Sequence, residues 1–276
     1  MKYVLVSIKT LIGLVFLLAG SGARAEPAPI YLGSVAMDIP AVMHKRLTPL
    51  TQYLSETLKQ PVVLKLSPNM AAAIDEVVAG DVDITYLTPV AYLEAHARNG
   101  ARLMVKTMTQ DAGFFKLMIV VRDDSPIQTV ADLSGKRFAL DDKAALLQRA
   151  VVVGAGMPLE KLGVYDFLGH YDNIVRSVMH HDYDAGILKD TTAYKWQDKG
   201  IRILYSSPEL PPYNITARNN LDDRLFARLQ QAFLKLDISN PHHKPVIEAL
   251  SPSYTGFTRT SDAEYEIVRK LVKPFK

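Results

Sequence analysis

Short apolar runs alternate along the chain with longer segments whose apolar residues recur every three or four positions. The runs predict buried strands, and the longer spacing predicts amphipathic helices. The predicted strands are 28–36, 61–67, 83–89, 116–121, 137–140, 163–168, 184–190, 200–207 and 214–218. The predicted helices between them are 45–60, 69–80, 90–100, 130–133, 144–154, 173–181 and one from 191. This order predicts an α/β protein with parallel sheets and right-handed crossovers, followed by mainly helix after Asp222.

One pattern of helix, acidic pair and buried strand occurs twice. Gly80–Pro89 reads GDVDITYLTP, and Asp182–Asp190 reads DYDAGILKD, so that Asp83 corresponds to Asp184. Each copy ends in a loop at the carboxyl end of a strand, where open α/β sheets bind ligands. The repeat therefore predicts two similar lobes that face a shared crevice, although an acidic helix stop is also common in other α/β proteins. We interpret the acidic pairs as turn and capping residues rather than as a metal site.

The first 25 residues have the pattern of an export signal. Lys2 and Lys9 make its start positive, and the apolar run Leu11–Ala19 is too short to span a bilayer. Ala23 and Ala25 place small residues at the −3 and −1 positions of a signal-peptidase cleavage site. We expect a mature chain that begins at Glu26 in the periplasm; an uncleaved anchor is the alternative.

Composition narrows the possible functions. The sequence has no cysteine, which excludes thiolate catalysis, thiolate metal sites and a lipid anchor on cysteine. It holds 32 basic and 29 acidic residues, and the three basic residues of the leader account for the difference. A neutral mature chain has no general attraction to nucleic acid or to anionic lipid.

Motifs for catalysis and for metal binding are absent from the sequence. It contains no G-x-S-x-G, no H-E-x-x-H and no glycine-rich phosphate loop. His180–His181 and His242–His243 are adjacent pairs, and neighbours in sequence do not share a helix face. We predict a protein that is not an enzyme and that uses neither cofactor nor metal.

Several segments together resemble periplasmic solute-binding proteins of the phosphate, phosphite and phosphonate importer family. They read LTPLTQYLSETLKQPV, AAAIDEVVAGDVDITYLTPVAY, IVVRDDSPIQTVADLSGKRFAL, GHYDNIVRSVMHHDYDAG and NITARNNLDDRLFARLQQAFLKL. The resemblance covers most of the chain and implies a bilobal, type II-like periplasmic binding protein. With it we assign the signal peptide to 1–25, the first lobe to 26–118 plus 212–276, and an inserted second lobe to 119–211.

Loops at strand ends supply the candidate ligand-binding residues. The candidates are Met37, Asp38, Thr88, Tyr92 and Phe115, with Phe114 beside it, from the first lobe, and Ala144, Ala145, Gln148, His170, Lys189 and Asp190 from the second. The resemblance implies that Thr88 and Tyr92 lie in the family's ligand loop, and that His170 lies in its Ser-His-Asp-like loop. Alternatively, Tyr92 packs its helix and His170 caps the helix that follows. We expect one of the two phenylalanines to lie in the core.

One segment departs from the family pattern. Phosphonate binders of the family usually carry a Ser-Thr-Ser-Gly cluster where this chain reads KAALL, Lys143–Leu147. Backbone amides at a helix start can still bind an anion, and Lys189, His170 and Gln148 could replace the lost hydroxyl donors. We therefore expect a small anionic or zwitterionic solute, which need not be a phosphonate, and we expect Tyr92 and Phe115 to cover its apolar part.

These features together predict a monomeric binding protein without catalytic activity. It would capture a small solute between its two lobes and deliver it to an ABC permease in the inner membrane. The first alternative is a sensing protein with the same fold that docks on a sensor kinase. The second is a secreted or periplasmic enzyme.

Overall fold

The computed structural model describes most of the chain, namely residues 27–35, 39–143 and 145–275. The predicted export signal and three candidate ligand-binding residues, Met37, Asp38 and Ala144, lie outside these ranges. No helix in the described ranges is both long enough and apolar enough to cross a membrane.

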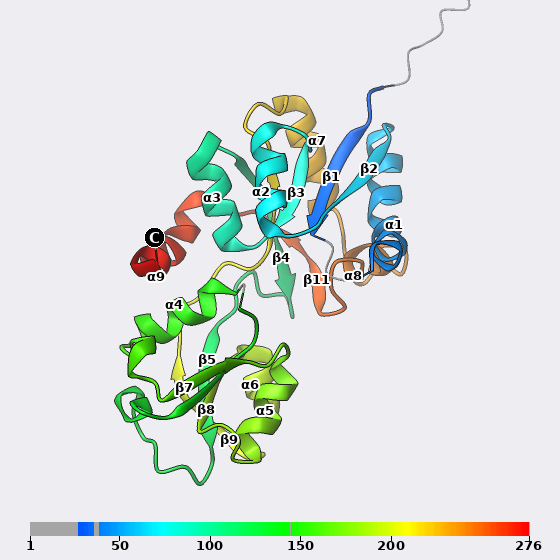
Figure 1. The fold of residues 1–276 in the computed structure, drawn as a ribbon. Coiled ribbons are helices and arrows are strands. Elements are labelled where there is room, and N and C mark those ends of the chain that lie inside the picture. Colours follow the sequence, from blue (N-terminus) through cyan, green and yellow to red (C-terminus); the bar gives the residue numbers. More distant parts are fainter. Residues whose placement is uncertain (1–26, 36–38, 144, 276) are drawn as a thin grey trace, which may run out of the picture.

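The strands form two separate sheets (Figure 1). The first sheet has the order β11-β4-β10-β3-β1-β2, and the second has the order β7-β6-β8-β5-β9. The strands are β1 (Ile30–Val35), β2 (Val62–Ser67), β3 (Ile84–Leu87), β4 (Arg102–Thr109), β5 (Leu117–Arg122), β6 (Arg137–Leu140), β7 (Val164–Phe167), β8 (Ala185–Lys189), β9 (Ile201–Ser206), β10 (Asn214–Ala217) and β11 (Tyr254–Thr258).

Helices pack against both sheets. The α-helices are α1 (Pro40–Leu58), α2 (Met70–Ala79), α3 (Pro89–Asn99), α4 (Leu146–Gly154), α5 (Tyr171–Met179), α6 (Asp190–Trp196), α7 (Asp223–Leu234), α8 (Lys244–Glu248) and α9 (Glu266–Val272). Short 3-10 helices occupy Val130–Leu133, Leu159–Lys161, Asp262–Tyr265 and Lys273–Phe275. We call the first sheet with α1, α2, α3, α7 and α8 the first body, and the second sheet with α4, α5 and α6 the second body.

The prediction of parallel sheets is confirmed for only part of each sheet. β1 runs parallel to β2 and β3, and β6 runs parallel to β7 and β8. However, β10 runs antiparallel between β3 and β4, and β5 runs antiparallel between β8 and β9. Each sheet is therefore mixed, because the chain enters or leaves it on a strand without a helical crossover.

Two strands of the first sheet are missing from the sequence prediction. β4 follows α3 after a short turn at Gly100, and its partly buried residues do not alternate regularly. β11 is a short strand with Gly256 at its centre, in a segment that otherwise reads as helix. Because β11 is an edge strand of five residues, its sequence carries little strand pattern.

The helix predicted at 45–60 packs one face against the first sheet. Its predicted apolar residues Leu47, Leu50, Leu54 and Leu58 are buried, which confirms the predicted face. Tyr53 on the same face is partly buried, and its hydroxyl donates a hydrogen bond to the carbonyl of Ala232 in α7, 2.7 Å away. This helical face therefore belongs to the core of the first body.

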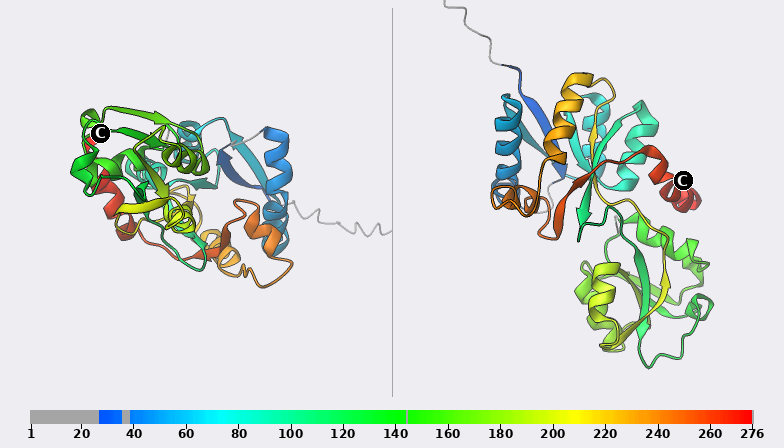
Figure 2. Two further views of the ribbon diagram at one scale, coloured as in Figure 1. Left: turned by 90° about the horizontal axis from the view of Figure 1, so that it is seen from below. Right: turned by 180° about the vertical axis from the view of Figure 1, so that it is seen from behind.

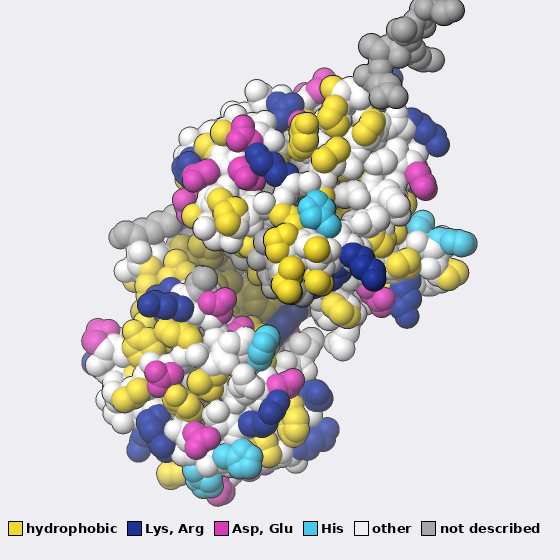
Figure 3. All heavy atoms as spheres, turned by 45° about the vertical axis from the view of Figure 1, so that its right-hand side comes forward, with side chains coloured by type: hydrophobic (Ala, Val, Ile, Leu, Met, Phe, Trp, Pro, Cys, Tyr) yellow, Lys and Arg dark blue, Asp and Glu magenta, His cyan; other side chains and the backbone are white. Residues whose placement is uncertain are grey.

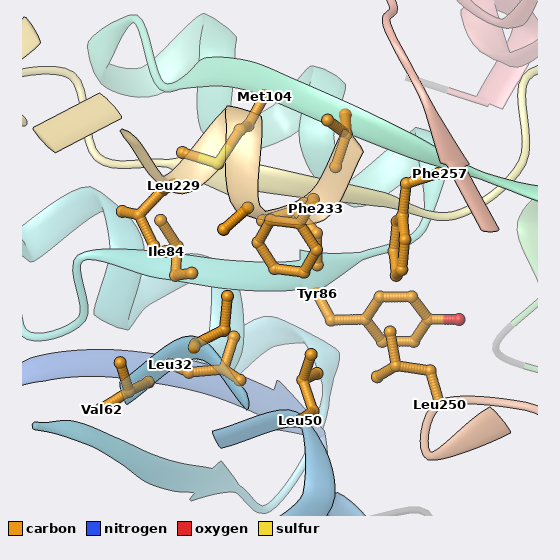
Figure 4. Close-up of a cluster of buried hydrophobic side chains, with 14 of the residues drawn as sticks. Leu32, Leu50, Val62, Ile84, Tyr86, Met104, Leu229, Phe233, Leu250 and Phe257 are labelled. Carbon is orange, nitrogen blue, oxygen red and sulfur yellow. The ribbon is translucent and has the colours of Figure 1, made fainter. Parts of the chain in front are cut away.

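Aromatic rings from the C-terminal half of the chain complete that core. Phe233 of α7 meets Phe257 of β11 edge to face, with ring centroids 5.0 Å apart. Figure 4 shows both rings in one cluster with Ile84 and Tyr86 of the sheet. The first body is thus built from both ends of the chain, with the second sheet formed by the segment between them.

The second aspartate of each repeated pair has the same structural role in its own sheet. Asp83 Oδ2 accepts a hydrogen bond from the backbone N–H of Tyr31, and its Oδ1 accepts one from Arg218 Nε. Asp184 Oδ2 accepts one from the backbone N–H of Arg137, and its Oδ1 accepts one from Nη2 of the Arg137 side chain. Both precede the amino end of a strand, which agrees with their interpretation as turn residues. In the described ranges, no group of three or more His, Asp or Glu residues could hold a metal ion.

Two antiparallel connectors join the bodies. Phe115 and Leu210 exchange backbone hydrogen bonds of 3.0 and 2.9 Å, so the chain enters the second sheet beside the place where it leaves. Relative motion of the bodies would bend these two connectors.

The C-terminal helix α9 contacts both bodies. It packs against α3 of the first and α4 of the second (Figures 1 and 2). Val268 and Val272 of α9 share one buried cluster with Leu93 of α3 and Val151 of α4. Although α9 belongs to the C-terminal segment predicted for the first lobe, it also packs against the second body.

Candidate solute-binding cleft

A cavity of about 440 Å³ lies where the two bodies face each other. The first body contributes Thr88 and neighbouring residues of α2 and α3, and the second contributes Asp141, Gln148 and the start of α4. Figure 3 shows a hollow between the bodies, with hydrophobic side chains deep inside it. The volume falls within the range of about 300–1,000 Å³ that is typical of small-molecule sites.

Four of the predicted ligand-binding residues line this cavity: Thr88, Phe115, Ala145 and Gln148. They come together because the strands of each body end toward the other body. Thr88 follows β3 and caps α3, and its Oγ1 accepts a hydrogen bond from Ala91 N at 3.1 Å. Its hydroxyl proton can still be donated to another acceptor.

Gln148 holds its neighbours in place. Only 3% of it is exposed, and its Oε1 accepts a hydrogen bond from the backbone N–H of Asp141 at 2.9 Å. Its amide nitrogen lies 3.4 Å from the hydroxyl of Tyr171. Because both ends of the amide have protein partners, Gln148 positions the wall of the cavity.

Two acidic residues in the wall are missing from the sequence prediction. Asp141 and Asp142 directly follow β6 and line the cavity. Burial, and then the negative charge of Asp142, raise the pKa of Asp141, while His170 and the hydrogen bond with Gln148 oppose the rise. Asp141 Oδ1 is buried and has no hydrogen-bond partner among the described residues. The position of this pair at a strand end was the available sequence signal.

Two tyrosines also line the cavity and are likewise missing from the prediction. Tyr171 begins α5, and Tyr213 lies on the connector before β10. The ring of Tyr213 stacks on Tyr86, with centroids 4.8 Å apart. Burial raises the pKa of Tyr213 to about 12, with further contributions from Tyr254 and from the two acids, Asp142 and Asp141.

Tyr92 is not among the residues that line the cavity, and its predicted contact with the ligand stays a prediction. It is 1% exposed, and its hydroxyl donates a hydrogen bond of 2.6 Å to Asp262. Its ring meets Tyr265 edge to face, with centroids 4.8 Å apart. Tyr92 lies one helical turn after Thr88 and packs α3 against the C-terminal segment. This agrees with the alternative prediction that Tyr92 packs its helix.

A smaller cavity of about 120 Å³ holds another group of predicted residues. It is lined by Phe114, Phe115, Lys189 and Asp190, among others. Lys189 Nζ lies 5.5 Å from the centroid of the Phe115 ring, and burial lowers the pKa of this lysine although Asp190 opposes the shift. Phe114 is 43% exposed, and Phe115 is partly buried against the hydrophobic cluster that contains α9.

Asp190 has a local structural role. Its Oδ2 accepts a hydrogen bond of 2.8 Å from the backbone N–H of Lys116, and its Oδ1 accepts one of 2.7 Å from that of Thr191. The carboxylate thereby ties the first connector to the start of α6.

His170 is exposed and lines neither cavity. It precedes α5, but its side chain makes no hydrogen bond that caps this helix. The capping alternative is therefore wrong, and the predicted contact of His170 with a solute stays a prediction.

The comparison with known families identifies the kind of protein. A family model described as "ABC transporter, phosphonate, periplasmic substrate-binding protein" matches residues 32–265. The chain belongs to this family. Proteins of the family are periplasmic, bind small solutes and work with the permease of an ABC transporter.

Individual relatives agree with this membership. The phosphate-import protein PhnD of Mycolicibacterium smegmatis is 24% identical over 278 residues, which cover 90% of this chain and 86% of that protein. The structure of XAC2383 from Xanthomonas citri bound to ATP has a TM-score of 0.71 at 20% identity and covers 89% of this chain and 96% of that one. PhnD1 from Prochlorococcus marinus in complex with methylphosphonate has a TM-score of 0.68 at 17% identity and covers 91% and 99%. At these identities the structures establish the bilobal α/β fold.

Proposed function

We propose that this protein is the non-catalytic solute-binding component of an ABC importer, and that it binds its solute in the main cavity between the two bodies. The observation that carries the proposal is the cavity itself, because its walls come from both bodies. A solute that contacts both walls would stabilise a closed form, which a permease could then recognise.

Three further parts of the proposal follow from the sequence. Residues 1–25 are removed during export, so the mature chain begins at Glu26 in the periplasm. The first lobe comprises 26–118 and 212–276, the second comprises 119–211, and the protein acts as a monomer. The relatives give no support to docking on a sensor kinase, so that alternative is not proposed.

The names of the relatives do not establish which solute this chain binds. The phosphate-import protein and the methylphosphonate complex belong to the same family, but the start of α4 in this chain presents Ala145, Leu146 and Leu147 to the cavity. These side chains offer no hydroxyl groups to an oxyanion. The residues that line this cavity therefore determine which solute it can bind.

The proposal is tested on protein exported to the periplasm of its host and purified without denaturation. Native mass spectrometry should show a mature chain that begins within two residues of Glu26 and carries a small co-purifying solute. Small-angle X-ray scattering should then show a smaller radius of gyration with the solute than after its removal. A retained leader would contradict the export proposal. Protein that carries no solute and never contracts would contradict binding in the cleft.

A further inference from the structure

We infer that the cleft selects an organic oxyanion with a bulky apolar substituent. Its anionic group binds Lys189 in the smaller cavity, and its substituent lies along the apolar wall of the main cavity. This inference rests on the proposed function, because it names the class of solute for the same cleft. It adds a positive charge and a size requirement, which together distinguish the solute from inorganic phosphate and from methylphosphonate.

Most side chains that line the main cavity are apolar, and they come from both bodies. Helices α2 and α3 supply one side of this apolar wall, and the start of α4 supplies the other. Its members are Met70, Ile74, Val90, Leu146 and Leu147. Figure 3 shows hydrophobic side chains deep in the hollow between the bodies. A cavity of about 440 Å³ is far larger than a phosphate ion, and an apolar substituent that fills it gains free energy in proportion to the area it buries.

The charge of the main cavity disfavours an anionic group there. The charged residues among its described lining residues are Glu94, Asp141 and Asp142, and these lining residues include no Lys, Arg or His. Carboxylates repel an anionic group that comes close to them, most strongly where water is excluded. The oxyanion of the solute therefore needs a positive partner beside this cavity.

The smaller cavity adjoins the main one. Phe115 lines both cavities, and the centroid of its ring lies 5.5 Å from Lys189 Nζ. Burial and then the charge of Asp141 raise the pKa of Tyr171 in the main cavity, and Asp190 of the smaller cavity adds to this rise. An electrostatic effect of this kind requires Tyr171 and Asp190 to lie near each other. A single solute that extends past the Phe115 ring can therefore contact both cavities.

Lys189 is available to a solute. Among the described residues, its ammonium group has no hydrogen-bond or ion-pair partner. Burial lowers the pKa of Lys189 and the charge of Asp190 opposes this shift, while both carboxylate oxygens of Asp190 accept from backbone N–H groups. The side chains of Thr109, Gln110 and Thr191 line the same cavity and offer further donors. An oxyanion bound here gains a charge-assisted hydrogen bond from the lysine.

The test is isothermal titration calorimetry of the mature protein after its solute has been removed. The probes are inorganic phosphate, a series of methyl-, propyl- and hexylphosphonate, and hexanol, which has the longest chain without the anionic group. Each methylene group that reaches the apolar wall should strengthen binding about fourfold, so hexylphosphonate should bind at least about tenfold more tightly than methylphosphonate. Hexanol should bind at least about tenfold more weakly than hexylphosphonate, because it lacks the charge that pairs with Lys189.

The outcomes separate this inference from the proposed function. Phosphate or methylphosphonate that binds as tightly as hexylphosphonate would overturn the inference while leaving the proposed function intact. Equal affinity for hexanol and hexylphosphonate would overturn it as well, since the anionic group would then contribute nothing. If no probe binds at millimolar concentration, the inference is also overturned, and the proposed function is judged separately by the solute that co-purifies.

Replacement of Lys189 tests the anionic half of the site. Lys189→Met keeps a side chain of similar length beside Phe115 but removes its charge, and the variant loses no ion pair with a described residue. It should weaken hexylphosphonate binding at least about tenfold and leave hexanol binding unchanged. Lys195→Met is the matched control, because Lys195 also lies over an aromatic ring, that of Trp196, but is exposed on α6. Equal affinities of the two variants would overturn the assignment of Lys189.

Replacement of Leu146 tests the apolar half. Leu146 is partly buried at the start of α4 and lines the main cavity. Leu146→Ala should weaken hexylphosphonate binding about fivefold or more but methylphosphonate binding less than about twofold, because only the longer substituent reaches this side chain. The same loss for both probes would show that the substituent does not lie along this wall, and would overturn the inference.

Discussion

At neutral pH, the charged side chain of Asp141 should make the ligand-free protein less stable than a variant with an uncharged residue at this position. Burial and the charge of Asp142 raise its pKa, so folding favours its protonated form. Its contribution to stability is present below the unfolded pKa of about 3.9 and is lost as pH rises through the higher folded value. We expect Asp141→Asn to raise the free energy of unfolding at neutral pH by on the order of 1 kcal/mol. Urea unfolding should show this gain shrinking toward acidic pH; a gain independent of pH would contradict the argument.

Tyr92 should matter for stability and not for binding. Tyr92→Phe keeps the ring against Tyr265 but removes the hydrogen bond to Asp262, a carboxylate that Arg269 also contacts. We expect a loss of roughly 1 kcal/mol in the free energy of unfolding, since a hydrogen bond is removed while the packing remains. Affinity for the bound solute should not change. If the variant instead binds the solute more weakly at unchanged stability, Tyr92 takes part in solute binding and this prediction is wrong.

The sequence allowed several residues near the cavity to be predicted, but not the acidic and aromatic side chains in its wall. Thr88, Phe115, Ala145 and Gln148 line it because residues at strand ends converge wherever strands of two lobes face each other. Spacing along a helix does not tell which face of α3 meets α9, so the burial of Tyr92 against Tyr265 could not be predicted from it. The acids after β6 read as ordinary loop residues until the structure shows them in the wall.

At the scale of the elements, Asp83 and Asp184 each connect the loop before one strand to a neighbouring strand through a backbone hydrogen bond. Asp184 binds both the backbone and the side chain of Arg137, whereas Asp182 is exposed on the same loop. We expect Asp184→Ala to lower the free energy of unfolding by about 1–3 kcal/mol, because the strand N–H loses its charged acceptor. Asp182→Ala, as the control, should change it by less than about 0.5 kcal/mol. Equal effects in thermal unfolding would contradict this role.

The strands joined by helical crossovers could be predicted, and so could the antiparallel strands β5, β9 and β10, whereas β4 and β11 could not. β3 is buried along its whole length and β8 as far as Leu188, because both faces of the sheet are covered there. β4 and β11 lie side by side at one end of the first sheet, where partial exposure weakens the pattern. Pairing across more than a hundred residues, as between β4 and β11, leaves no trace in local spacing.

For the whole molecule, α9 makes the two bodies share part of one core. Val268 lies in the cluster formed by α3, α4 and α9, whereas Val77 lies in a cluster confined to the first body. Val268→Ala and Val77→Ala remove the same atoms from fully buried sites, and each should cost about 2 kcal/mol. Because local openings follow local contacts, hydrogen–deuterium exchange should quicken in both α3 and α4 for Val268→Ala, but only in the first body for Val77→Ala. Unchanged exchange in α4 of the Val268 variant would show that α9 belongs to the first body alone and leaves the second free to move.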